Sequence, residues 1–148
     1  KAVKKCQNCG ILDTINPCKI CTSDMRSTTT ICIVEDMADV WAFERSGYHK
    51  GLYHVIGGLL SASKNFTEQD LKLNFLKQRI EKNNIQEIIL ALSATIEGQT
   101  TALVIKDSLE SLKIKITQLA YGVPVGSEIH YLDDNTLGAA LESRKDLG

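Results

Sequence analysis

Apolar residues follow two spacings along the chain. Short, nearly continuous apolar runs, typical of strands buried on both faces, occur at 30–34, 52–56, 87–92 and 114–119. Apolar residues that recur every three or four positions predict amphipathic helices at 36–45, 67–82 and 98–112, and a strand and a short helix are predicted at 129–132 and 135–143. Strand–helix repetition with short connections predicts an α/β fold with a mainly parallel sheet.

Single residues refine these elements. The helical spacing at 36–45 places Met37, Val40 and Trp41 on a buried face, so Trp41 is expected in the core rather than stacked on a nucleic-acid base. Thr67 and the residue three positions later, an Asp, have the spacing of a capping box. His54, inside a predicted strand, is expected to be a core residue rather than a ligand.

Four of the five cysteines form two Cys-x-x-Cys pairs, Cys6 with Cys9 and Cys18 with Cys21. Each pair can place two thiolates on one turn, and two facing turns give the sulfur tetrahedron that zinc prefers. Iron and a disulfide framework are the alternatives. Disulfides fit less well, because nothing else indicates secretion and Cys32 would be left over. Cys32 lies in an apolar run, where a small buried side chain is expected.

A zinc site with four thiolates predicts a structural role, because it leaves no open coordination position for water. The metal would supply the folding free energy that so short a loop cannot obtain from burial. Residues 1–26 contain five basic side chains against two acidic ones. Lys4, Lys5 and Lys19 are therefore candidate contacts to a phosphate backbone, with ordinary solvated lysines as the equally good alternative.

Composition narrows the class of protein. The 148 residues are 43% hydrophobic, and 17 Lys and Arg against 18 Asp and Glu give a net charge of -1. This balance excludes a polybasic protein and disfavours a disordered one. No apolar run approaches the roughly 20 residues that span a bilayer. The chain does not begin with Met, so it is expected to be a piece of a longer protein.

Ligands of parallel sheets gather at the carboxyl ends of the strands. Glu35 and Asp36 follow the first predicted strand, Gly57 and Gly58 the second, and the segment 93–98 the third. Glu35 and Glu97 are thus the acidic groups expected nearest a site. For Glu97 the alternative is capping of the helix predicted to begin at residue 98, where the helix dipole favours negative charge.

The order of these features resembles the RecR family of bacterial recombination mediators. The most specific segments are 31–35, 51–58, 97–102 and 122–126. The resemblance implies a four-cysteine zinc finger, a Toprim domain with a Rossmann-like sheet, and a C-terminal strand–helix segment described as Walker B-like and expected to contact another subunit. The corresponding boundaries are 1–26, 27–122 and 123–148.

The resemblance also implies function. Members act with RecO and RecF to load RecA on single-stranded DNA coated with single-strand-binding protein, and full-length subunits can form a tetrameric ring as a DNA clamp. A helix-hairpin-helix domain usually precedes the zinc finger and supplies much of the DNA contact. Without it we expect a homodimer with weakened DNA binding. The implied location is the bacterial cytoplasm, at the nucleoid during repair, with no membrane partner.

Toprim enzymes pair a Glu after the first strand with Asp-x-Asp after a later strand, and these carboxylates hold Mg²⁺. This chain keeps Glu35 but has Ser93-Ala94-Thr95 at the later position. We therefore expect no catalysis, and we expect Glu97, with Glu35 as a weaker candidate, to receive RecO. The alternative is a metal-dependent nuclease or primase-like enzyme. ATP hydrolysis is not expected, because the sequence has no Walker A loop.

Overall fold

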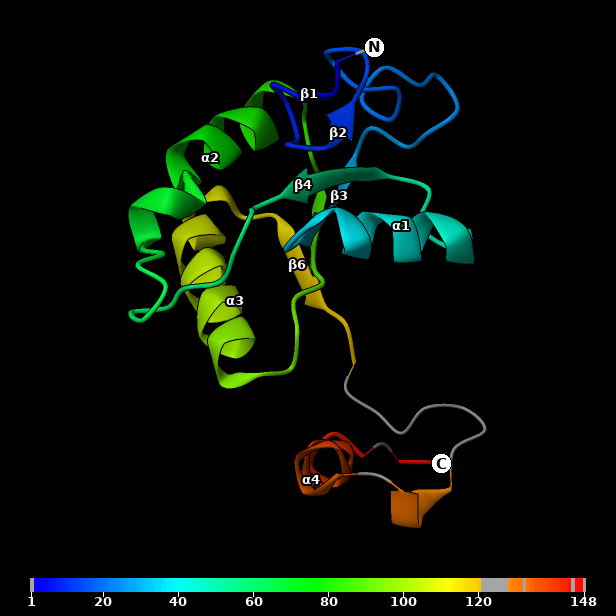
Figure 1. Cartoon of the computed structure of the whole chain (residues 1–148), viewed down its shortest axis with the longest axis vertical. Helices are drawn as coiled ribbons and strands as arrows, with labels where there is room; N and C mark the ends of the chain where they lie inside the picture. Colours follow the sequence, from blue (N-terminus) through cyan, green and yellow to red (C-terminus); the bar gives the residue numbers. More distant parts are fainter. Residues whose placement is uncertain (1, 121–127, 132, 145, 148) are drawn as a thin grey trace. The chain divides into compact units, whose positions relative to one another are not determined.

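The computed structural model describes residues 2–120, 128–131, 133–144 and 146–147, and the chain divides into two compact units, Lys1–Gln118 and Leu119–Gly148. A four-stranded, fully parallel sheet forms the centre of the first unit (Figure 1). Its strands lie in the order β4 (Leu52–Val55), β3 (Thr30–Val34), β5 (Glu87–Leu90) and β6 (Lys115–Gln118). The predicted parallel α/β sheet is confirmed.

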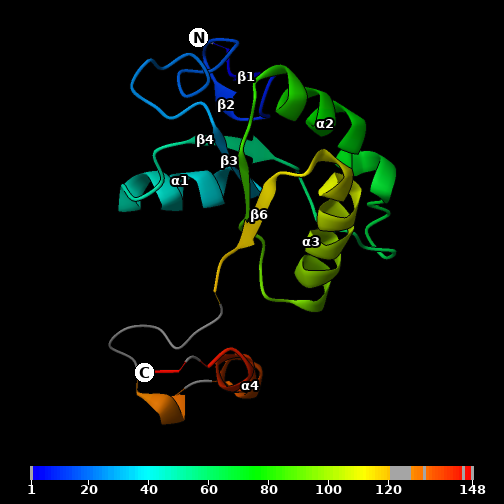
Figure 2. The ribbon, with the colours of Figure 1, turned by 180° about the vertical axis from the view of Figure 1, so that it is seen from behind.

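Helices cover both faces of this sheet. Ile31 and Ile33 of β3 pack with α2 (Leu73–Lys82) and α3 (Ile96–Leu109). The intervening side chains, Cys32 and Val34, pack with α1 (Met37–Ser46) and with the cysteine module. Figures 1 and 2 show α1 on one side of the sheet and α2 and α3 on the other.

The helix ends depart in part from the sequence pattern. The Thr67–Asp70 capping box is present, but it opens a 3-10 helix, η1 (Glu68–Leu71), and not the whole predicted helix 67–82. Lys72 adopts a left-handed conformation with φ 52°, which separates η1 from α2. The helix predicted at 98–112 begins two residues earlier and ends in a second 3-10 turn, η2 (Glu110–Leu112).

The prediction that Trp41 is buried is wrong, since its side chain is 62% exposed. The buried face of α1 centres on Val40, with Met37 and Phe43 partly covered three positions to either side. A helix turns by about 100° per residue, so Trp41 falls outside this narrow stripe. Burial of His54 and Cys32 is confirmed.

The cysteine module packs on the α1 side of the sheet. It contains a small antiparallel pair, β1 (Lys4–Lys5) with β2 (Leu12–Asp13). At its end, Arg26 donates two hydrogen bonds of 2.9 Å to the carboxylate of Glu44 on α1, and the Tyr53 hydroxyl donates to the same carboxylate. This bidentate pair joins the module, α1 and β4.

The second unit contains η3 (Ile129–Tyr131) and α4 (Asp134–Glu142). The strand predicted at 129–132 is wrong: residues 129–131 form a 3-10 turn, and residue 132 lies outside the described residues. A Walker B motif is a run of apolar residues that ends in an acidic one, and Asp133 and Asp134 are the acidic residues of that pattern here. Asp133 is the N-cap of α4, so this pair begins a helix and does not end a strand. Segment 122–126 also lies outside the described part. Among the described residues, no helix is long and apolar enough to cross a membrane.

Candidate metal centre and acidic edge

The four cysteines of the two Cys-x-x-Cys pairs meet in one cluster, although up to 15 positions separate them in sequence. Their Sγ atoms all lie within 4.8 Å of one another, with 3.8 Å between Cys6 and Cys21 and 3.6 Å between Cys9 and Cys18. A tetrahedral zinc ion with Zn–S bonds of about 2.3 Å separates its sulfurs by about 3.8 Å. The cluster therefore has the dimensions of a site that could hold one metal ion.

The first turn of this cluster depends on Gly10. Its φ of +86° is the left-handed conformation expected for the residue after a Cys-x-x-Cys turn. A Cβ on this residue would lie 2.9 Å from the carbonyl oxygen of Val55, and the Val55 N–H donates a 2.7 Å bond to the carbonyl oxygen of Cys9. The turn thus rests directly on the end of β4.

Polar hydrogens surround the sulfurs. Backbone N–H groups of Ile11, Cys18 and Cys21 donate to Sγ of Cys9, Cys6 and Cys18 at 3.3–3.4 Å. The Cys18 sulfur raises the pKa of Cys9, and it raises the pKa of Cys21 to about 12. The close sulfurs thus disfavour the thiolate forms of Cys9 and Cys21, and metal binding, which needs thiolates, is coupled to proton release.

A buried arginine completes the cluster from outside the cysteine module. Arg79 of α2 is 7% exposed, and its Nη2 lies 3.8 Å from Sγ of Cys21. Its Nη1 donates to the carbonyl oxygen of Tyr53 at 2.7 Å and lies 3.0 Å from Nδ1 of His54. No carboxylate among the described residues forms an ion pair with it. A buried cation needs a compensating charge, and four thiolates around a divalent metal ion, formally -2, would supply one.

The second cluster lies at the carboxyl end of β3 and combines Glu35, Asp36 and Asp39. Asp36 caps α1 by accepting from the Asp39 N–H, and Asp39 accepts from the Glu35 N–H at 3.2 Å. Burial, followed by the charges of Asp36 and Asp39 and a smaller contribution from Glu97, raises the pKa of Glu35. The electrostatic contribution of Glu97 agrees with the expectation that both acids lie at this edge.

Hydroxyl groups occupy the loop after β5. Thr95 is the N-cap of α3: its Oγ1 accepts from the Gly98 N–H at 3.1 Å and lies 2.8 Å from Oγ of Ser93. A Cβ on Gly98 would overlap the carbonyl oxygen of Ser93, so the loop folds tightly over the helix start. These hydroxyls have structural partners and carry no charge for Mg²⁺.

Glu97 is exposed in the first turn of α3. It is not the cap, because α3 begins at Ile96 and Thr95 caps it; its carboxylate still lies where the helix dipole favours negative charge. Ile96 beside it is 84% exposed. This edge therefore presents an acidic group next to an uncovered apolar side chain.

The candidate phosphate contacts Lys4, Lys5 and Lys19 are exposed residues of the cysteine module. Lys4 and Lys5 are successive residues of β1, so their side chains point to opposite faces. The Lys19 backbone N–H donates to Asp13, while the Lys19 side chain is exposed. Lys4 pairs with Asp13 in the β1–β2 ladder, so Lys4 and Lys19 both lie beside Asp13.

The family comparisons agree with this architecture. The Toprim domain model matches residues 29–120, and the model for RecR, C-terminal, matches residues 122–145. Recombination protein RecR of Rhizobium meliloti is 49% identical over 144 residues, which cover 97% of this chain and 72% of that protein. The chain belongs to the RecR family. Proteins of the same name from Parvibaculum lavamentivorans and Rhodospirillum rubrum are 48% and 52% identical, covering 95% and 97% of this chain and 70% and 73% of their own.

Sequence reasoning missed three residues of this RecR-family chain. The sequence pattern did not single out Arg79 or Asp39. Thr101 is fully buried, where its hydroxyl donates to the carbonyl oxygen of Glu97 at 2.7 Å and accepts from the Leu60 N–H at 2.9 Å. The chain pattern gives no sign of these contacts, since each joins segments that are distant in sequence or depends on a side-chain direction.

Proposed function

We propose that this chain is a non-catalytic mediator of recombinational DNA repair, a DNA-clamp subunit that acts with RecO and RecF to promote RecA loading on single-stranded DNA coated with single-strand-binding protein. Membership of the RecR family carries this proposal, since its curated relatives are named recombination proteins. The neutral Ser93 and Thr95 at the position of the enzymatic Asp-x-Asp support the absence of catalysis.

The four-cysteine cluster is proposed to hold one structural Zn²⁺. Its all-sulfur donor set and its sulfur spacing suit zinc, and four thiolates leave no position for an activated water. Zinc would supply free energy that folds the module onto the sheet. The residues that bind it would be Cys6, Cys9, Cys18 and Cys21.

The acidic edge is proposed to receive RecO, with Glu97 as the principal contact and Glu35 as a second one. An exposed carboxylate steers a basic partner, and the neighbouring exposed Ile96 offers apolar area for a contact. The same Glu97 also stabilises the start of α3, so the two roles are compatible.

A pull-down on immobilised RecO tests this contact. Glu97→Lys is expected to reduce retention at least about tenfold, because it places like charges opposite each other. Glu81→Lys, the same charge change on an exposed position of α2, is the matched control and should bind like the unchanged chain. Equal binding of all three would refute the contact, and retention of none would count against RecO as the partner.

A second candidate function rests on the carboxylates of Glu35, Asp36 and Asp39, whose oxygens lie within 4.8 Å of one another. Such a group resembles a divalent-cation site and would suit a Toprim nuclease or primase-like enzyme. Cleavage of labelled single-stranded DNA that requires Mg²⁺ and is abolished by Glu35→Gln would establish it. We expect no cleavage by either form.

The assembly is proposed to be a homodimer of this chain, with a tetrameric ring for the full-length protein. In α4, Leu137 and Leu141 are 41% and 63% exposed and lie one turn apart. Apolar side chains at this spacing form a stripe suited to another subunit. The chain is proposed to act in the bacterial cytoplasm, at the nucleoid, and its DNA binding to be weak without a helix-hairpin-helix domain.

A further inference from the structure

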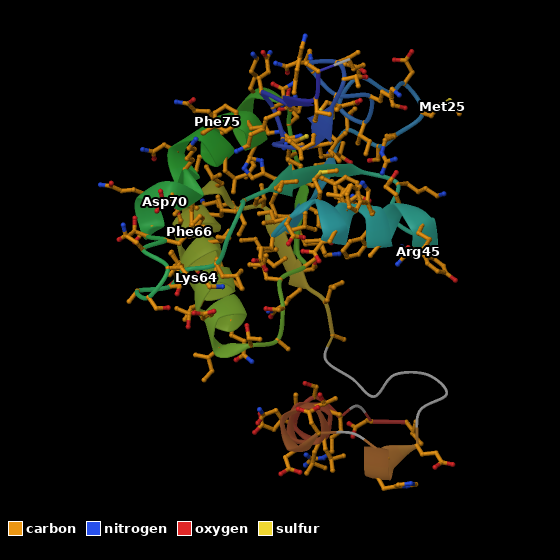
Figure 3. All side chains as sticks on the ribbon, viewed as in Figure 1. Met25, Arg45, Lys64, Phe66, Asp70 and Phe75 are labelled. Atoms are coloured by element: carbon orange, nitrogen blue, oxygen red, sulfur yellow. The ribbon has the colours of Figure 1, made fainter. Side chains whose placement is uncertain are left out.

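A cavity of about 500 Å³ lies between the cysteine module and the segment that leads into α2. One wall is the Cys6–Gly10 turn and the end of β4; the other comes from Phe66 and from residues 70–72 and 75. Figure 3 labels Phe66, Asp70 and Phe75 on the second wall. Neither the metal centre nor the acidic edge uses the open side of this cavity.

Both walls are held in place by backbone hydrogen bonds. The bond from the Val55 N–H to the carbonyl oxygen of Cys9 fixes the cysteine turn against β4. Phe66 forms an isolated antiparallel bridge with Ser61, with two hydrogen bonds of 3.0 Å. The cavity is therefore formed before any ligand arrives, which lowers the ordering cost of binding.

Aromatic rings line the second wall. Phe75 is 44% exposed although it carries a large apolar ring, and that ring lies 6.2 Å from the ring of buried His54, tilted by 32°. Phe66 also lines the cavity and is partly covered. Flat apolar surfaces that remain open to solvent suit a flat ligand such as a nucleic-acid base.

Each wall of the cavity carries a basic side chain. The aliphatic part of Lys5 lies against the cysteine turn, with its Cε 3.7 Å from the position of a Cβ on Gly10. Lys72 lines the opposite wall at the start of α2. Both side chains are exposed, and within the described part of the chain neither forms an ion pair. The carboxylate of Asp70 already accepts from the Thr67 N–H and hydroxyl.

We propose that this cavity binds one nucleotide of single-stranded DNA, with the base against Phe75 and Phe66 and the neighbouring phosphates on Lys5 and Lys72. The inference rests on the proposed function, and it names where that function meets the strand. Two cations flanking an aromatic wall match the alternation of phosphate and base. An acidic peptide would use the same lysines, but the ring wall favours the base.

Binding of fluorescein-labelled (dT)20 to the metal-loaded chain, followed by anisotropy at several salt concentrations, tests the site. Phe75→Ala should weaken binding at least about fivefold, because base stacking is lost, whereas Phe75→Tyr should retain it. Lys5→Gln with Lys72→Gln should lower the slope of log K against log salt by about 1.4, roughly 0.7 per phosphate contact on a single strand. Leu103→Ala, an exposed apolar residue of α3, and Lys82→Gln are the controls.

A second measurement protects the test from variants that fold poorly. Ultraviolet crosslinking of the unchanged chain to an oligonucleotide containing 5-iododeoxyuridine should attach it to Phe75 or Phe66, as mapped by mass spectrometry. Crosslinks elsewhere, unaltered affinity in Phe75→Ala, or no binding of (dT)20 would overturn the cavity assignment. None of these results would decide the proposed function, which the pull-down on RecO tests separately. Tighter binding of a fluorescein-labelled Asp- and Phe-rich peptide than of (dT)20 would also overturn it.

Discussion

Burial decides the charge of individual side chains in this chain. His54 is 6% exposed, and burial, with a further contribution from the Arg79 charge, lowers its pKa to about 3. The ring is therefore neutral at pH 7, and Nδ1 can accept the hydrogen bond from Arg79. A neutral buried histidine makes folding sensitive to acid.

The pH dependence has a definite sign. Below its unfolded pKa of about 6.5, His54 takes up a proton in the unfolded chain but not in the folded one. Above that pH, His54 therefore does not lower the free energy of unfolding. Below it, the free energy of unfolding falls by about 1.4 kcal/mol per pH unit, because only the unfolded chain takes up the proton. His54→Asn keeps an acceptor for Arg79 and removes this loss. Urea unfolding of both forms at pH ~7.5 and ~5.5, on either side of the unfolded pKa, measures it, and an identical drop in both would contradict the assignment.

At the scale of elements, α1 shows how a helix can be recognised while its face is misjudged. Val40 is 2% exposed and the adjacent Trp41 is 62% exposed. Val40 is the one buried residue of the helix, and Met37 and Phe43 are partly buried beside it, so its buried face is a narrow stripe. Hydrophobicity alone assigned both residues to the buried face.

Two truncations test this placement. Val40→Ala should lower the free energy of unfolding by at least about 1.5 kcal/mol, because it opens a space beside Cys32 and Val34. Trp41→Ala should change it by less than about 0.5 kcal/mol, since exposed sites tolerate truncation. Circular dichroism follows urea unfolding in both variants, because Trp41 is the single tryptophan. A larger loss for Trp41→Ala would show that another surface covers it.

The same elements show what can be predicted from sequence. The strands with continuous apolar runs, such as 30–34, were predicted within two residues, because burial on both faces leaves a strong local signal. The four cysteines were recognised from spacing alone, since each pair acts within one turn. The break at Lys72 and the 3-10 turn at 129–131 were missed, because backbone conformations at these positions follow from packing and not from residue type.

At the scale of the whole first unit, Arg79 links the cysteine cluster to the sheet. Its guanidinium contacts Cys21 from one segment and Tyr53 and His54 of β4 from another, although Arg79 lies 58 positions beyond Cys21. Cys6, Cys9 and Cys18 also share one apolar cluster with Cys32 and its neighbours. Metal binding is therefore expected to stabilise the sheet together with the module, as one cooperative unit.

Removal of the metal and of Arg79 tests this linkage. Chelation should release one zinc ion per chain and lower the Tm of the single unfolding transition, because the buried thiols lose the cation that binds them. Arg79→Met should weaken zinc affinity, measured by competition with a chromogenic chelator, by about 10- to 100-fold, as is usual when a partner of a metal ligand is lost. Arg45→Met, an exposed position of α1, is the control. Unchanged zinc affinity in Arg79→Met would mean that Arg79 stabilises the core but does not support the metal site. A separate low-temperature transition after chelation would mean that the module folds independently of the sheet.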